Sequence, residues 1–233
     1  MGLVGAFRFA KSRCPALWVG MGLGVVACVP VWWMETAVEG AGDHLTGLYE
    51  KAFVQQVLGA AVSEELFIFF GFLITFLLFR RTRIKTDGDV VAIAVAAAIG
   101  FTTIENVTAV LAADSPMTTA FSRLLSIVAG HASLQLLMGY FAAKCLLGTG
   151  NRPLYGLLMF AVPIAIHGWG DFSESVFQAV DPQSEQSRQF FSGWIIGVFA
   201  YLAGALIVLF KLREAALGEM LSASDTEQRS AKP

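Results

Sequence analysis

The sequence is short of charged residues for its length. Only 15% of its 233 residues are Asp, Glu, Lys or Arg, whereas about a quarter is typical of soluble domains. The 16 basic and 18 acidic residues give a net charge of −2, so the chain offers no polybasic surface for nucleic acid. Hydrophobic residues make up 56% of the chain, and the mean hydropathy is +0.65. This composition excludes an ordinary water-soluble domain and indicates a protein of the lipid bilayer.

Cysteine is also scarce. Cys14, Cys28 and Cys145 are far apart and lie within or beside apolar stretches, which fits neither a disulfide framework nor a thiolate metal site. The chain has no nucleotide-binding glycine loop, and no polar stretch long enough to form a soluble domain with its own core. Functional residues are therefore expected inside the bilayer.

Six long apolar stretches, separated by short polar breaks, each provide the roughly 20 residues that a bilayer crossing requires. The expected fold is all-α: a polytopic integral membrane bundle of about six helices, forming one domain over residues 1–212. We expect the spans at residues 15–34, 52–79, 90–113, 124–147, 154–180 and 191–210. The remaining tail, 213–233, is charged and poor in aromatic residues, which is typical of a disordered segment or a surface helix.

Basic residues are distributed unevenly between the two sides of this arrangement. Thirteen of the 16 fall on one side, whereas only Lys51, Arg123 and Arg188 fall on the other. Cytoplasmic loops carry the excess of Lys and Arg, so both termini and the tail are predicted to be cytoplasmic. Trp32 and Trp33 close the first span where an outer aromatic belt is expected.

Five ionisable residues stand out within the predicted spans. Glu64 and Glu65 lie in the second span, Glu105 in the third, His131 in the fourth and His167 in the fifth. Such groups are costly in a bilayer unless they face a cavity or a partner, so each is a functional candidate. A single His can equally serve as an interhelical hydrogen-bonding group. Two adjacent carboxylates are a poor structural device and favour a role in acid or base chemistry.

The same residues are expected at a common depth. Glu64, Glu105, His131 and His167 each lie 13 to 16 residues from the cytoplasmic end of their own span. At about 1.5 Å per residue, this places them about 20–24 Å from that boundary. Four consecutive spans therefore contribute to one polar layer, which favours a single site over four unrelated positions.

Charge balance in this layer leaves its cofactor undecided. Three glutamates meet two histidines, and no Lys or Arg is expected at this depth, so the layer holds either extra protons or a cation. Glu and His are residue types that bind zinc, although they are not arranged as a local HExxH motif. Two polar neighbours are candidate supporting residues: Asn106 follows Glu105, and Asp171 lies four residues after His167, where it can orient the ring.

The ordered set of motifs resembles the PrsW family of bacterial intramembrane proteases, within the superfamily of CAAX prenyl proteases and bacteriocin-processing enzymes. The resemblance covers roughly residues 60–175. It rests on four short motifs: Glu64-Glu65, the segment from Phe101 to Glu105-Asn106, His131 followed by Gly139, and His167 followed by Asp171. The family implies a multi-pass protein of the bacterial cytoplasmic membrane that cleaves a membrane-associated protein or peptide.

The resemblance also implies roles for the polar layer. Glu64 and Glu65 would activate water, while Glu105 and His131 would position the water or bind a metal. His167 would polarise the scissile carbonyl or support its oxyanion. Family members are described as metalloproteases, whereas the wider superfamily has also been interpreted as using glutamate-activated water without metal. The cofactor therefore stays open, with a divalent metal such as zinc as one alternative.

One departure from the family pattern affects the expected activity. The family usually carries a basic residue shortly after the double glutamate, and Ile68 and Phe69 occupy those places here. An inactive relative that binds transmembrane helices is therefore an alternative to a protease. A proton-coupled transporter is another, because intramembrane Glu and His also relay protons, and broken helices or repeated halves would favour it. Glycine pairs in the first and sixth spans are close-packing motifs that could also mediate a homodimer.

Overall fold

The computed structural model describes residues 3–148 and 151–230, and these are helical apart from short connections. The helices are α1 (Leu3–Gly42), α2 (Leu48–Ala52), a π-helix η1 (Phe53–Ala61), α3 (Val62–Phe79), α4 (Asp87–Ala112), α5 (Pro116–Ala129), α6 (His131–Leu146), α7 (Arg152–Ala179) and α8 (Glu185–Ser230). No strand occurs in the described part of the chain. The predicted all-α class is therefore confirmed.

Five helical segments in the described residues are long and apolar enough to cross a membrane. They are Pro15–Gly42, Leu48–Phe79, Asp87–Ala112, Arg152–Ala179 and Glu185–Gly218. These correspond to five of the six predicted spans, and they make the chain a multi-pass membrane protein. The first is longer than predicted, because α1 continues through the polar residues Glu35 and Glu39 to Gly42. Counting apolar residues alone ends the span before these glutamates.

The fourth predicted span, 124–147, is not one continuous helix. α5 ends at Ala129 and α6 begins at His131, and between them Gly130 has φ −89° and ψ −113°, outside the helical region. Glycine has a low helix propensity, but hydropathy does not reveal where a helix breaks. As a result, His131 is the first residue of α6 and lies at the positive end of that helix.

Local sequence signals define other helix starts. Thr86 and Asp89 form a capping box at the start of α4: the Thr86 hydroxyl accepts a bond from the Asp89 backbone N–H, and the Asp89 carboxylate accepts one from Thr86 N–H. Asn151 caps α7 by accepting a hydrogen bond from Leu154 N–H, with Pro153 in the first turn. Both helices begin at the same end of the bundle.

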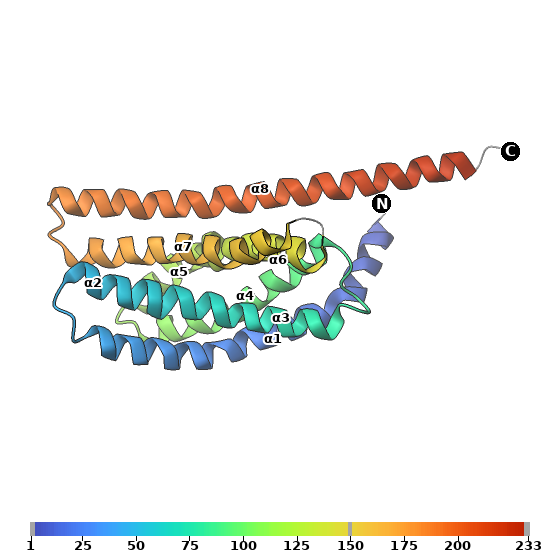
Figure 1. Ribbon diagram of the computed structural model, residues 1–233. Coiled ribbons are helices and arrows are strands. Elements are labelled where there is room, and N and C mark those ends of the chain that lie inside the picture. Colours follow the sequence, from blue (N-terminus) through green and yellow to red (C-terminus); the bar gives the residue numbers. More distant parts are fainter. Residues whose placement is uncertain (1–2, 149–150, 231–233) are drawn as a thin grey trace.

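The helices lie side by side in an elongated bundle (Figure 1). The first turns of α1 and the last turns of α8 lie at the same end as the α3–α4 turn (Figure 1), which carries Arg80, Arg81, Arg83 and Lys85. The cytoplasmic identity of that end, and with it the placement of both termini, stays a prediction. The tail after Arg213 continues α8 as a helix to Ser230.

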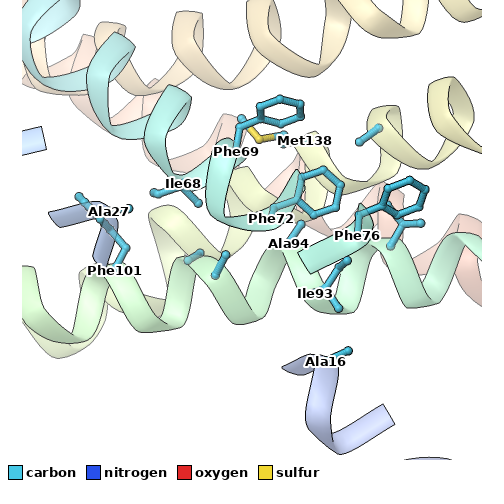
Figure 2. Packing of buried hydrophobic residues seen from close by; sticks show 14 of the residues in the cluster. Ala16, Ala27, Ile68, Phe69, Phe72, Phe76, Ile93, Ala94, Phe101 and Met138 are labelled. Atoms are coloured by element: carbon cyan, nitrogen blue, oxygen red, sulfur yellow. The ribbon is translucent and has the colours of Figure 1, made fainter. Parts of the chain in front are cut away.

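The apolar core lies beside the polar layer along α3. It contains Ile68, Phe69, Phe72 and Phe76 of α3, packed with Ile93 and Phe101 of α4 and Met138 of α6 (Figure 2). Phe72 and Ile68 have no exposed surface. Close packing of this kind, rather than exclusion of water, holds helices together in a bilayer.

Glycines allow α1 to contact α4 through the backbone. A Cβ atom at Gly24 would overlap the carbonyl oxygen of Ala97, and one at Gly100 would overlap that of Met21. In α8, a Cβ atom at Gly193 would lie 3.2 Å from atoms of the α7 side chains Ser173 and Trp169. The glycine pairs of the first and sixth predicted spans therefore pack within the chain. A homodimer stays a prediction.

Candidate active site

The two adjacent glutamates lie in the first turn of α3, directly after the π-helix η1. Glu65 is fully buried, and Glu64 is 7% exposed. Because consecutive helical residues point about 100° apart, the two carboxylates leave α3 in different directions. π-helical turns are rare and often occur at functional sites, and η1 here sets the rotation at which α3 presents the pair.

His167 of α7 is held from both sides of its ring. Its Nδ1 lies 3.0 Å from Glu65 Oε1, and its Nε2 lies 3.2 Å from Asp171 Oδ2, one turn further along α7. The same Nε2 is 3.9 Å from Glu64 Oε2. The predicted contact between His167 and Asp171 is confirmed. Two carboxylates thus fix the orientation of an imidazole that is buried in the bundle.

His131 joins the same cluster from α6. Its Nε2 lies 3.3 Å from Glu64 Oε2 and 3.1 Å from Glu105 Oε2, and its ring is 5.0 Å from that of His167 between centroids. Glu64, Glu105, His131 and His167 therefore meet, as the common depth predicted. The helices α3, α4, α6 and α7 each contribute one or more of these side chains.

Asn106, predicted as a supporting residue, is buried next to the cluster in sequence but is not tied into it. Neither polar atom of its side chain has a hydrogen-bond partner among the described residues. Glu64 Oε2, Glu105 Oε2 and His131 Nδ1 likewise make no hydrogen bond, although the two carboxylate oxygens face imidazole nitrogens. Buried polar atoms are rarely left in this state, so the cluster is suited to bind a further polar group or ion.

Sequence reasoning missed Gln135, which supports Glu65. The Gln135 Nε2 donates a 2.6 Å hydrogen bond to Glu65 Oε2, and the side chain has no exposed surface. Gln135 lies four residues after His131 and therefore on the same face of α6. The available signal was an amide side chain in an apolar stretch, four residues after His131. A search for ionisable residues alone does not find it.

Two charged residues also reach the cluster from outside the predicted layer. The Arg123 Nη1 of α5 lies 2.5 Å from Glu105 Oε1, so the expectation that no Lys or Arg lies at this depth is wrong. The reason is that α5 enters the bundle instead of forming an outer loop. Glu35 of α1 lies close enough to Glu64 for the two side chains to interact. Its position just past the predicted end of the first span was the signal for this contact.

The positions after the double glutamate contain no cation. Ile68 is fully buried and Phe69 is 7% exposed, and the Phe69 ring packs edge-on against Phe160 at 4.6 Å between centroids. Both residues belong to the apolar core (Figure 2). Where the family usually has a basic residue, this chain thus has apolar side chains that pack in the core.

Three of the clustered residues fit a metal ion. Glu64, His131 and His167 each offer one ligand atom, and these atoms all lie within 4.8 Å of one another. Two His nitrogens and one carboxylate oxygen form a donor set typical of catalytic zinc, which keeps a fourth position for water. Glu65 lies on the other nitrogen of His167, where metal-binding histidines usually have a carboxylate or carbonyl partner. The residues present therefore suit zinc.

Comparison with known proteins gives a family match over most of the chain. The family model described as PrsW family intramembrane metalloprotease matches residues 13–203. The Protease PrsW of Oceanobacillus iheyensis is 25% identical over 64% of this chain and 66% of its own length. The Protease PrsW of Geobacillus kaustophilus is 24% identical over 64% of this chain and 62% of its own length. The matched segments thus span slightly less than two thirds of both relatives. No solved structure matches the chain.

Proposed function

This chain belongs to the PrsW family of intramembrane metalloproteases, and on that premise we propose that it hydrolyses a peptide bond of a membrane-associated protein. The observation that carries the proposal is the meeting of two histidines and three glutamates from four helices, all within ion-pair distance of a neighbour. A bacterial cytoplasmic membrane is the location that the relatives and the distribution of Lys and Arg support.

In the proposed site, Glu64, His131 and His167 would hold a zinc ion. When bound there, the ion would polarise the scissile carbonyl and lower the pKa of water. Glu65 orients the His167 ring through Nδ1. This leaves Nε2, which lies near Asp171 and Glu64, as the nitrogen that would face the ion.

Glu105 is the carboxylate best placed to take up the proton of the attacking water. It lies outside the three-residue ligand set, and its Oε2 makes no hydrogen bond. Its side chain is 28% exposed, compared with 10% for Glu64 and 0% for Glu65, so it is the least buried of the three glutamates. A general base must lie within hydrogen-bonding reach of that water, and Glu105 faces the ligand His131 at 3.1 Å.

The test compares cells that express the wild-type protein with cells that express the double variant Glu64→Gln, Glu65→Gln. Membrane and secreted proteins are searched for new peptide termini near membrane spans. We expect termini that occur only with the wild type, which would identify the substrate and the depth of the cut. The exposed Glu50 of α2 supplies a matched control, because Glu50→Gln makes the same chemical change away from the cluster. Equal termini in wild type and double variant, at equal expression, would rule out the proposed activity.

The break at Gly130 favours a second candidate, a proton-coupled transporter. Discontinuous helices with polar residues at the break are typical binding elements of carriers, and here Glu105 contacts His131 at such a break. This function predicts proton uptake into reconstituted vesicles that is lost in Glu105→Gln, without new peptide termini. Uptake that is equal in wild type and Glu105→Gln would exclude it.

A further inference from the structure

Arg123 places a positive charge at the edge of the acidic cluster. Four carboxylates each lie within ion-pair distance of at least one of the two imidazoles: those of Glu64, Glu65, Glu105 and Asp171. Carboxylates therefore outnumber histidines in the cluster. Buried charges of one sign are costly unless they are paired. Among the ion pairs of the described residues, Arg123 is the Lys or Arg that reaches this cluster, through Glu105.

The Glu105 carboxylate joins two partners, one at each oxygen. Its Oε1 lies 2.5 Å from Arg123 Nη1, and its Oε2 lies 3.1 Å from His131 Nε2. Arg123 belongs to α5 and His131 is the first residue of α6, with the non-helical Gly130 between these helices. One carboxylate of α4 therefore ties both halves of the broken helix to the same point.

This arrangement makes the orientation of His131 depend on Arg123. A carboxylate that is held at one oxygen by a guanidinium has its other oxygen aimed in a defined direction. Without Arg123, the Glu105 side chain is held at one oxygen only, by His131, and α5 loses its ion pair to α4 seven residues before the break. The Arg123 side chain is 40% exposed, so it lies outside the closely packed core. Its effect on the site therefore comes from orienting Glu105 and not from packing.

We propose that Arg123 is a positioning residue, whose guanidinium fixes Glu105 and, through Glu105, the His131 imidazole across the break at Gly130. The inference rests on the proposed function, because it assigns Arg123 to the same site. It goes beyond that function by placing a required residue on α5, outside the four helices that supply the clustered Glu and His.

The first test measures cleavage of a reporter that carries the site found in the comparison of termini. We expect Arg123→Gln to lower kcat by about 10- to 100-fold, the range typical of residues that orient metal ligands, and to leave KM near the wild-type value. Arg123→Lys keeps the charge but loses the planar fork, and it should recover part of the lost kcat. Lys51→Gln removes another basic residue outside the cluster and should match the wild type.

A second test does not need cleavage. The melting temperatures of purified Arg123→Gln, Glu105→Gln and the double variant form a double-mutant cycle. If the pair holds α5 to α4, the double variant loses less than the sum of the two single losses. Additive losses would show that the two side chains act independently and would overturn the inference.

The two tests separate this inference from the proposed function. Wild-type kcat in Arg123→Gln, while Glu64→Gln, Glu65→Gln is inactive, would overturn the role of Arg123 and leave the protease intact. Equal termini in wild type and the double glutamate variant would instead remove the protease, and the positioning role would fall with it even if the melting temperatures are coupled. A general folding defect would lower kcat in both Arg123→Gln and Arg123→Lys, and the losses of melting temperature in the cycle would be additive. That outcome would also contradict the proposal.

Discussion

The buried side chains in the first turn of α3 and those in the turns that follow it are chemically opposite. Glu64 and Glu65 begin the helix, and Ile68, Phe72 and Phe76 continue it, all with 7% exposure or less. The apolar residues contact other apolar side chains in one cluster (Figure 2). The glutamates instead face polar groups from α6 and α7. Burial alone therefore does not distinguish core from site, and the partners from other helices do.

The largest effect should come from removing a residue on the polar side of this comparison. His131→Gln replaces the imidazole by an amide that can still donate a hydrogen bond to Glu64 or Glu105. We expect zinc binding and cleavage to fall to background, with little change in melting temperature. Zinc content and melting are measured on the same purified sample. Full zinc content in this variant would remove His131 from the ligand set.

The reverse result is expected on the apolar side. Phe72→Ala deletes a fully buried ring and should lower the free energy of unfolding by about 3–5 kcal/mol. The cleavage rate per folded molecule should be largely retained, because the described ring contacts of Phe72 are with Phe69 and Phe76 of the apolar core. Thermal unfolding in detergent, with zinc content at a low temperature, checks both parts. A variant that stays stable but loses zinc would mean that core and site are one unit.

A smaller effect is expected at Gln135, which lies between the two regions. Gln135→Leu keeps the volume but leaves Glu65 Oε2 without its 2.6 Å hydrogen bond, and we expect activity to fall about 10-fold. Gln135→Asn shortens the donor and serves as the matched polar control, with an intermediate loss. Equal activity of all three proteins would show that His167 alone orients Glu65.

The sequence predicted the apolar spans and the common depth of the polar residues because both depend on counting along single helices. Glu64, Glu105, His131 and His167 were found in this way, and the structure brings them together. The break at Gly130 and the contacts of Arg123, Gln135 and Glu35 could not be found by counting. They depend on which helices pack together and at what rotation, and hydropathy contains no information on either.

The same limits explain which parts of the fold were predicted. Five predicted spans correspond to long apolar helices, because about 20 apolar residues have few stable alternatives in a bilayer. The fourth was predicted as continuous, since α5 and α6 are together long and apolar enough, and a single glycine changes their mean hydropathy very little. The tail, 213–233, was predicted from composition to be disordered or a surface helix. The backbone of α8 continues through it to Ser230, and residues 231–233 lie outside the described residues.

The smallest effect should come from the exposed counterpart of the buried ion pairs. Lys51 Nζ lies 2.8 Å from Asp43 Oδ1 near the start of α2, and both side chains are open to solvent. The Lys51 ammonium holds the pKa of Asp43 below its usual range. A carboxylate whose pKa is lower in the folded state stabilises the fold above its unfolded pKa of about 4, and this contribution fades as pH falls through the folded pKa.

Because exposed pairs contribute little and are screened by salt, we expect Lys51→Met to leave the melting temperature at pH 7 nearly unchanged. The difference between Lys51→Met and wild type should shrink further at pH 3 or in high salt. A large loss at pH 7 would show that the outer loop stabilises the bundle as strongly as the buried cluster does.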